Sequence, residues 1–277
     1  MSFAPENGCN APCVFLTRRS ELDDRWDPNF YKRMGEFRNR VQQCPFPIKP
    51  LRGFLSEVQY GISERATEEP IGVPMLRMIN LQDDTWDLAD LKYIALRAED
   101  VKRYLLHSGD ILFNRTNSKE LVGKCGVFNL SGQYVFASYL IRVRLRQESL
   151  RPEYVTAFLS SGLGRIQIDA VSRQIAGMTN INAEEIRALS IPVLNEGAQA
   201  AVVSAWRVAI QRRDKTLEKA REILATLDDV LLDELSIPRQ PEPPNTLSGR
   251  MFQRKLRGLT GSRWDPIANQ NRRRCLE

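Results

Sequence analysis

The stretch Glu196–Leu235, EGAQAAVVSAWRVAIQRRDKTLEKAREILATLDDVLLDEL, determines how the rest of the chain is interpreted. Its apolar residues recur at alternating steps of three and four, which is the a/d heptad pattern of a coiled-coil helix. Asn195 is expected to cap this helix and Pro238 to end it. Forty residues at about 1.5 Å each predict a rod of roughly 60 Å. The pattern occupies Val203, Trp206, Ile210, Arg213, Leu217, Ala220, Leu224, Leu227 and Leu231.

A rod of this length is too long for a small domain, so it is predicted to be a spacer and a dimerisation surface. Arg213 is the one polar residue at an a/d position, and two interpretations of it stay open. Its side chain reaches solvent at the edge of the seam, or it pairs with Asp214 or Glu218 of a partner helix and fixes the register. The residues predicted to make the dimer contact are Val203, Trp206, Ile210, Leu217, Leu224, Leu227 and Leu231.

The composition is that of a globular protein. Of the 277 residues, 42% are hydrophobic and 27% are charged. No apolar run reaches the length of about 18 residues that predicts a membrane span, and the first residues, MSFAPENGCNAPCVF, do not have the pattern of a secretory signal. We therefore expect a cytoplasmic protein. The five cysteines include Cys9 and Cys13 but no second Cys/His pair, which predicts reduced thiols rather than a zinc site.

The net charge is unevenly distributed along the chain. Lys and Arg number 40 against 34 Asp and Glu, a net charge of +6. Residues 237–277 hold nine basic and three acidic residues, which accounts for the whole +6 and leaves residues 1–236 neutral. Within the neutral part, residues 80–100 are mostly acidic and residues 102–146 mostly basic. This pattern fits DNA on one face of the domain, or an ordinary solvated surface.

The segment before the heptad helix predicts a mixed domain. A short helix is expected after Asp24 or Asp27, with Pro28 in its first turn. Short apolar runs between turns predict strands across residues 51–145, helical spacing returns over residues 152–169, and residues 172–182 are expected to form a polar loop. These patterns predict an α+β fold: a mixed α/β domain with a small twisted sheet, followed by one long coiled-coil α-helix. The predicted parts are an N-terminal tail (1–20), the mixed domain (21–195), the long helix (196–236) and a basic tail (237–277).

One four-residue word occurs twice. Arg-Trp-Asp-Pro stands at residues 25–28 and again at residues 263–266, a period of 238 residues. A repeated word that contains Trp is rarely accidental. The chain is therefore predicted to hold one full repeat and the opening of a second.

The residue patterns of common catalytic centres are missing. His107 is the single histidine, and it precedes a Ser-Gly turn. The sequence has no HExxH word, no GxxxxGK[ST] loop and no glycine-rich nucleotide loop after a strand. Asp110 with Glu120 and Lys124 comes nearest to a nuclease set, but the spacing is wrong. We therefore expect a binding protein with no catalytic residue, metal ligand or cofactor of its own.

Several short sequence motifs of the mixed domain resemble those of one known family. Their order, and the long heptad helix that directly follows them, are similar to the specificity subunit of type I restriction-modification enzymes. The match is to one target recognition domain and one conserved coiled-coil helix, over roughly residues 21–236. The most specific parts are the strand Gly-Asp-Ile-Leu-Phe-x-Arg and the Ile-Pro before the helix. The motifs are Gly61–Ser63, Val73–Asn80, Ser108–Arg115, Val122–Lys124, Asn180–Asn182 and Leu189–Pro192.

The resemblance carries expectations about partners. The family's usual chain holds two recognition domains and two helices, so this chain resembles a half-size form that would dimerise through its helix. The resemblance implies binding to double-stranded DNA, to the methyltransferase (modification) subunit and to the restriction subunit. S-adenosylmethionine, Mg²⁺ and ATP are then expected on those partner subunits. A homodimer would read an interrupted palindrome, because each half-site meets an identical domain.

Polar residues at loop tips are the predicted DNA contacts. Phosphate contacts position a protein on DNA and base-edge contacts give sequence specificity, and Arg, Lys, Asn, Gln and Ser can supply both. For each residue, a solvated loop side chain is the alternative. The candidates are Ser63, Arg65, Arg77, Arg115, Thr116, Asn117, Ser118, Lys119, Lys124, Arg173, Gln174 and Thr179.

Two other functions stay open from the sequence. The chain could be a stand-alone coiled-coil DNA-binding regulator, which would not bind a methyltransferase subunit. It could also be the recognition fragment of a fused modification-restriction enzyme, which would bind S-adenosylmethionine by itself. Co-purification with a methyltransferase subunit separates the specificity-subunit hypothesis from both.

Overall fold

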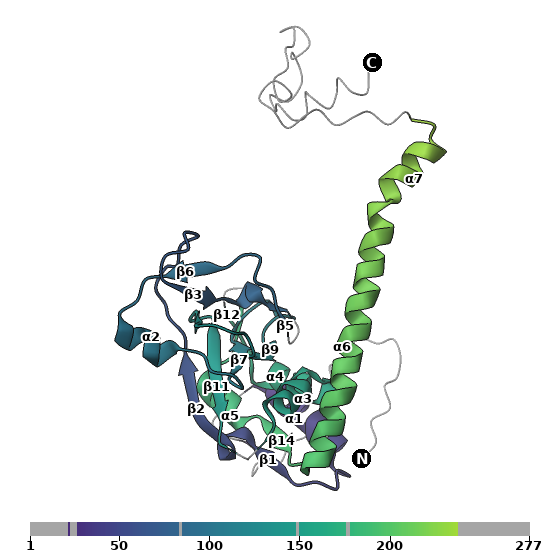
Figure 1. Ribbon diagram of the computed structural model, residues 1–277. Coiled ribbons are helices and arrows are strands. Elements are labelled where there is room, and N and C mark those ends of the chain that lie inside the picture. The colour runs from purple at the N-terminus through teal and green to yellow at the C-terminus, as the bar shows by residue number, and fades with distance from the viewer. Residues whose placement is uncertain (1–21, 23–26, 83–84, 148–149, 176–177, 238–277) are drawn as a thin grey trace. The chain divides into compact units, whose positions relative to one another are not determined.

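The structure is a computed structural model that describes residues 22, 27–82, 85–147, 150–175 and 178–237. The predicted N-terminal tail, the second Arg-Trp-Asp-Pro word and the basic tail beyond Ile237 lie outside these residues. The chain divides into two units, residues 1–211 and residues 212–277. The first unit contains every described strand and the start of the long helix (Figure 1).

Seven α-helices occur in the described residues. The first begins as the sequence predicts, because the Asp27 carboxylate accepts the backbone N–H groups of Asn29 at 3.0 Å and Phe30 at 3.4 Å. Pro28, which has no N–H to satisfy, opens its first turn. The helices are α1 Pro28–Val41, α2 Ala98–Tyr104, α3 Pro152–Ser160, α4 Gly162–Val171, α5 Ala183–Ala188, α6 Glu196–Ala225 and α7 Leu227–Glu234.

The described strands are short and form several small sheets, which confirms the predicted α+β class. The sheets are β2-β11-β7-β9, β10-β3-β6, β12-β13-β8, β1-β14 and β4-β5. The strands are β1 Ile48–Pro50, β2 Leu55–Tyr60, β3 Val73–Leu76, β4 Leu81–Gln82, β5 Thr85–Trp86, β6 Lys92–Ile94, β7 Ile111–Asn114, β8 Thr116–Asn117, β9 Cys125–Val127, β10 Val135–Phe136, β11 Leu140–Leu145, β12 Arg173–Ile175, β13 Met178–Asn180 and β14 Ser190–Pro192.

The antiparallel sheet β2-β11-β7-β9 lies between two hydrophobic clusters. Because side chains along a strand alternate between its faces, Ile111 and Phe113 of β7 enter the larger cluster and Leu112 enters the smaller one. Side chains of α1, α3 and α4 complete the larger cluster, and side chains of β3 and β10 complete the smaller one. β7 is therefore buried on both faces, which explains its continuous Ile-Leu-Phe sequence.

A two-stranded sheet closes the domain just before the long helix. In it β1 pairs antiparallel with β14, and Lys49 lies opposite Ile191. The buried hydroxyl of Tyr154 on α3 donates to the carbonyl of Pro192 at 2.7 Å. Burial raises the pKa of the Tyr154 hydroxyl, which keeps it in the protonated form that donates this hydrogen bond.

Charged side chains form a network against the central sheet. The Asp110 carboxylate is 2% exposed and accepts from Arg144 Nε at 2.7 Å and Nη2 at 2.8 Å. The hydrogen bond from Asp110 raises the pKa of the Arg144 guanidinium. Glu57 accepts from Arg144 Nη1 at 2.8 Å and from Arg142 Nη2 at 3.0 Å, and Arg142 also donates to the Leu105 carbonyl. These partners satisfy charges that would be costly to bury alone.

The network corrects the interpretation of the charge pattern. Arg142 and Arg144 belong to the basic stretch 102–146, for which a DNA-facing surface and an ordinary solvated surface are the two predicted alternatives, but both are paired with acids of the domain. In the acidic stretch, Asp90 pairs with Arg77 at 3.0 Å. The division into an acidic and a basic stretch is therefore only partly a property of the surface.

The start of α6 is anchored in the first unit. Asn195 caps it as predicted, because its Oδ1 accepts the Ala198 N–H at 2.9 Å. The buried Gln199 accepts the backbone N–H of Arg151 at 2.9 Å. Val203 is buried in the larger hydrophobic cluster. The first turns of the helix are thus part of the domain core.

The predicted long helix is confirmed as α6 followed by α7, and the single residue Thr226 interrupts its regular hydrogen bonding (Figure 1). The N–H of Thr226 is shared between the carbonyls of Glu222 at 3.3 Å and Ile223 at 3.2 Å. The Thr226 hydroxyl also donates to the Ile223 carbonyl at 2.9 Å. Such local bonding by Thr competes with the regular helical ladder.

α7 ends through its own capping motif. Ser236 adopts a φ of 52°, in the left-handed region. Its N–H donates to the Asp233 carbonyl at 3.1 Å, and the N–H of Ile237 donates to the Leu232 carbonyl at 2.8 Å. This is the Schellman pattern of helix ends, formed here without glycine. Pro238, the predicted end of the helix, lies outside the described residues.

The Gly61 position gives a direct test of the fold. A Cβ at Gly61 would lie 2.3 Å from the Ala137 carbonyl oxygen and 2.4 Å from that of Phe136. Because both atoms are backbone, we expect Gly61→Ala to lower the free energy of unfolding by about 1–3 kcal/mol. The measurement is urea denaturation of the full-length protein.

Gly35 is the matched control for this change. It lies inside α1, and a Cβ there would meet no atom within 4 Å. We expect Gly35→Ala to raise the free energy of unfolding by up to about 1 kcal/mol through helix propensity. Equal stability of the Gly61→Ala variant and the unchanged protein would contradict the close crossing of these two chain segments.

Candidate nucleic-acid interface

Two segments that carry predicted DNA contacts meet in a small sheet. β8 pairs with β13, so that Thr116 lies opposite Asn180 and Asn117 lies opposite Thr179. The polar loop predicted over residues 172–182 is wrong, because β12 and β13 form a hairpin there. Candidates from the central segment and the closing segment, 64 residues apart at Thr116 and Asn180, therefore lie side by side.

Arg115 connects this small sheet to the end of the central sheet. Its N–H donates to the Tyr139 carbonyl at 3.0 Å, and its carbonyl accepts the Ile181 N–H at 2.9 Å. Its guanidinium carbon lies 4.9 Å from the centroid of the Tyr60 ring. Nη1 is 3.5 Å from the Ser138 carbonyl. The contacts bring together the end of β2, the end of β7 and the turn before β11.

The Gly61–Ser63 motif lies next to these contacts of Arg115. The Ile62 N–H donates to the Phe136 carbonyl at 2.9 Å, and the Ile62 carbonyl accepts the Ser138 N–H at 2.8 Å. Ser63 follows directly and is exposed. We define the Arg115 surface as Tyr60, Arg115, Ser138 and Tyr139, which these contacts link, together with the adjacent exposed Ser63.

Five predicted DNA contacts are exposed: Ser63, Arg65, Ser118, Lys119 and Arg173. The backbone around Lys119 is held, because its carbonyl accepts from Arg165 Nη2 at 3.1 Å. Arg173 makes an ion pair with Glu185 at 3.2 Å, although its side chain stays 60% exposed. Long exposed cations on a fixed backbone are suited to phosphate contacts.

Three other candidates have partners within the domain. The buried Thr116 hydroxyl donates to Asn180 Oδ1 at 2.6 Å, and Thr179 is also buried. The Arg77 guanidinium contacts both the carboxylate and the carbonyl of Asp90. Thr116, Thr179 and Arg77 therefore stabilise the domain next to the Arg115 surface.

Three further candidates are half-buried or incompletely described. Asn117 Nδ2 is 3.3 Å from Met78 Sδ, and its Oδ1 accepts the Ser118 N–H at 2.8 Å. Lys124 is half-buried, and its carbonyl accepts the Asn114 N–H at 2.8 Å. The backbone of Gln174 lies opposite Thr179, while its side chain lies outside what the structure describes.

Sequence reasoning missed two tyrosines of the Arg115 surface. Tyr60 is 40% exposed and Tyr139 is 50% exposed. The Tyr60 hydroxyl accepts the Ala183 N–H at the start of α5, at 3.0 Å. Tyr60 directly precedes Gly61 at a strand end, and this position was a signal that could have found it. Tyr139 stands in a short turn and carried no such signal.

The described residues show neither a metal cluster nor a transmembrane helix. No three His, Cys, Asp or Glu side chains in this part of the chain gather as a metal site. None of its helices is long and apolar enough to cross a membrane. Cys44 and Cys125 form no disulfide bond there, whereas Cys9, Cys13 and Cys275 lie outside the described residues.

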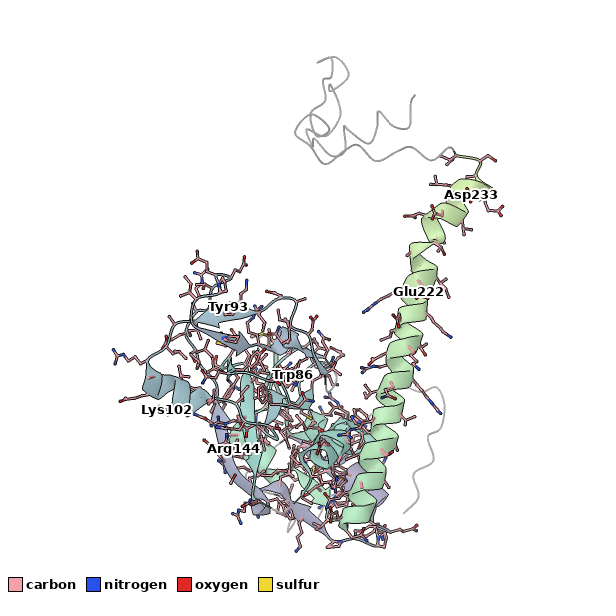
Figure 2. All side chains as sticks on the ribbon, viewed as in Figure 1. Trp86, Tyr93, Lys102, Arg144, Glu222 and Asp233 are labelled. Atoms are coloured by element: carbon pink, nitrogen blue, oxygen red, sulfur yellow. The ribbon has the colours of Figure 1, made fainter. Side chains whose placement is uncertain are left out.

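The heptad row changes character along the helix. Val203 is used by the core of its own domain, and Trp206 and Ile210 are half-buried. Beyond residue 211 the apolar members are open to solvent, with Leu217 48% and Leu224 67% exposed. Leu227 and Leu231 on α7 are exposed as well. Polar side chains such as Glu222 and Asp233 project from the same two helices (Figure 2). The exposed apolar row therefore starts within α6 and continues into α7.

No family model matches the chain. Among curated proteins, the chain is 24% identical over 180 residues to a protein of Methanocaldococcus jannaschii that is assigned as the type I restriction enzyme MjaX specificity subunit, covering 63% of this chain and 42% of that protein. It is 27% identical over 219 residues to the type I restriction enzyme EcoKI specificity subunit of Escherichia coli K12, covering 75% of this chain and 47% of that protein. The chain thus spans less than half the length of these curated relatives.

Among solved structures, the HsdS subunit of Thermoanaerobacter tengcongensis matches with 16% sequence identity and a TM-score of 0.47, over 75% of this chain and 50% of that chain. Both curated relatives are named as specificity subunits of type I restriction enzymes. This confirms the resemblance predicted from the motifs: the chain is similar to specificity subunits of type I restriction enzymes.

Proposed function

We propose that the chain gives DNA sequence specificity to a type I restriction-modification complex. The domain of the first unit binds one half of a bipartite target, and the chain recruits the methyltransferase and restriction subunits. The observation that carries this proposal is the Arg115 surface with the adjoining β8-β13-β12 sheet. Segments far apart in the sequence converge there and present cationic, hydroxyl and aromatic groups together.

The exposed groups divide by the kind of DNA contact they suit. Lys119 and Arg65 carry flexible cationic side chains, which suit phosphates. Arg115 lies on backbone fixed by hydrogen bonds, and Ser63 directly follows Ile62, whose N–H and carbonyl are both bonded; such positions suit base edges in a groove. On this proposal the chain works in the cytoplasm, and S-adenosylmethionine, Mg²⁺ and ATP bind to its partner subunits.

The helix supplies the second part of the proposal. The exposed leucines on α6 and α7 form a row at a/d spacing, which two copies can bury in one seam. A homodimer would place two identical domains on an interrupted palindrome, with the helices as the spacer. Arg213 pairs with Asp214 of its own helix at 2.8 Å, which favours a position at the edge of the seam.

Co-purification tests this function most simply. The full-length chain, tagged and expressed in its native host, is expected to carry a methyltransferase subunit with it, and the complex is expected to retain a specific duplex against excess random duplex. Specific DNA binding without such a subunit would favour a stand-alone regulator. Binding of S-adenosylmethionine by the chain alone would favour a fragment of a fused enzyme.

Substitution of Lys119 tests the phosphate contacts. We expect Lys119→Ala to weaken binding to all duplexes equally and to lower the slope of log affinity against log salt by about 1. The measurement is a titration of the complex with fluorescent duplex at several salt concentrations.

Lys102→Ala is the matched control. Lys102 is also an exposed lysine, but it lies on α2, which packs on β10 outside the Arg115 surface (Figure 2). The Lys102→Ala substitution is expected to leave the slope of log affinity against log salt unchanged. Equal slopes for the Lys119→Ala complex and the unchanged complex would remove Lys119 from the interface.

Substitutions in the apolar row test the dimer. Leu217→Asp and Leu224→Asp are each expected to convert a dimer to a monomer, because a charge would replace a buried leucine in the seam. Light scattering of the full-length protein over a range of concentrations reports the change. Val208→Asp is the control, because Val208 is an exposed apolar residue of α6 outside the a/d row. A concentration-independent monomer before any substitution would contradict the proposed dimer.

A further inference from the structure

Arg115 differs from the other arginines in the described residues that are buried or half-buried. Each of the others has a carboxylate within ion-pair distance, whereas no carboxylate there pairs with Arg115. The hydrogen bond that its guanidinium makes within the described residues is a long one, from Nη1 to the Ser138 carbonyl at 3.5 Å. The terminal N–H groups of Arg115 therefore keep donor capacity for a ligand. The paired arginines are Arg33 with Glu36, Arg77 with Asp90, Arg142 with Glu57, Arg144 with Asp110, Arg165 with Asp169, Arg187 with Glu184 and Arg213 with Asp214.

An aromatic ring takes the place of the missing acid. The Arg115 guanidinium lies over the ring of Tyr60, at 4.9 Å from the centroid. Both the backbone and the hydroxyl of Tyr60 are held in place. The backbone pairs with Ile141 in the central sheet, and the hydroxyl accepts the Ala183 N–H at 3.0 Å. A ring under a guanidinium attracts the cation and orients its plane without using the donors at its edge.

The backbone of Arg115 is held as firmly as its side chain. Its N–H and its carbonyl both make hydrogen bonds, to Tyr139 at 3.0 Å and to Ile181 at 2.9 Å. Lys119, by contrast, carries a single flexible ammonium on an exposed segment. A planar donor fork in one orientation matches two acceptors of one base, whereas a flexible point charge follows phosphates.

We infer that Arg115 reads a guanine edge in the DNA half-site and that Tyr60 is the positioning residue that aims it. The inference rests on the proposed function and deepens it. Two parallel N–H groups of Arg115 donate to the O6 and N7 acceptors that guanine presents in the major groove. Tyr60 keeps the guanidinium plane in the orientation that this bidentate contact needs.

Selection from a randomised duplex library tests this assignment. The full-length chain, purified with its methyltransferase subunit, is used unchanged and with Tyr60→Leu, Tyr60→Phe or Arg115→Lys. Tyr60→Leu and Arg115→Lys are expected to lower the preference for guanine at the same single position by about tenfold or more. Tyr60→Phe loses the hydroxyl that accepts the Ala183 N–H but keeps the ring and its strand pairing, and it is expected to keep most of that preference.

The variants distinguish a change in the orientation of the Arg115 guanidinium from a loss of folding and from a loss of positive charge. Arg115→Lys keeps the positive charge, so a phosphate contact would survive it with an unchanged base preference, and that result would overturn the inference. Loss of preference at different positions in the Tyr60→Leu and Arg115→Lys complexes would overturn it too, as would equal losses for Tyr60→Phe and Tyr60→Leu. Thermal melting of each complex confirms folding. If the unchanged complex selects no sequence at all, the proposed function fails, which is a distinct result from an unchanged guanine preference in the variants.

Discussion

The register of β11 between β2 and β7 is the constraint on which the rest of the domain depends. Ile141 of β11 lies opposite Tyr60 on one side and Phe113 on the other. A slip of one residue would exchange the faces of the strand, so that Arg142 and Arg144 would enter the hydrophobic cluster that now holds Ile141. The same register brings the end of β2 and the end of β7 to opposite sides of β11. The contact between Tyr60 and Arg115 is therefore a consequence of how the core is paired.

The charged network on the central sheet supports this register. Asp110 and Glu57 hold Arg144 between them, and Arg142 is almost fully buried beside Glu57. Removing one partner from a buried ion pair costs about 3–5 kcal/mol, because the other charge is left without compensation. A slipped strand would separate several of these pairs at once. The network thus pairs arginines that the linear sequence suggests are on the surface. Among the half-buried arginines of the described residues, Arg115 is left without a carboxylate partner.

Local signals in the sequence predicted the local parts of the structure. The caps at Asp27 and Asn195 and the strand Ile111–Asn114 follow from residue type and short spacing. The β8–β13 pairing could not be predicted in this way, since its strands are short, polar and 64 residues apart at Thr116 and Asn180. Heptad spacing also could not show that Val203 is packed inside its own domain while Leu224 is exposed. Periodicity identifies an apolar face but not what covers it.

On the proposed function, this chain determines which DNA sequence is modified. The sharpest measurement is methylome sequencing of a host that expresses the chain with its methyltransferase subunit, compared with the same host lacking the chain. We expect methylation at one interrupted sequence that appears only when the chain is present. Methylation that is the same with and without the chain would contradict it.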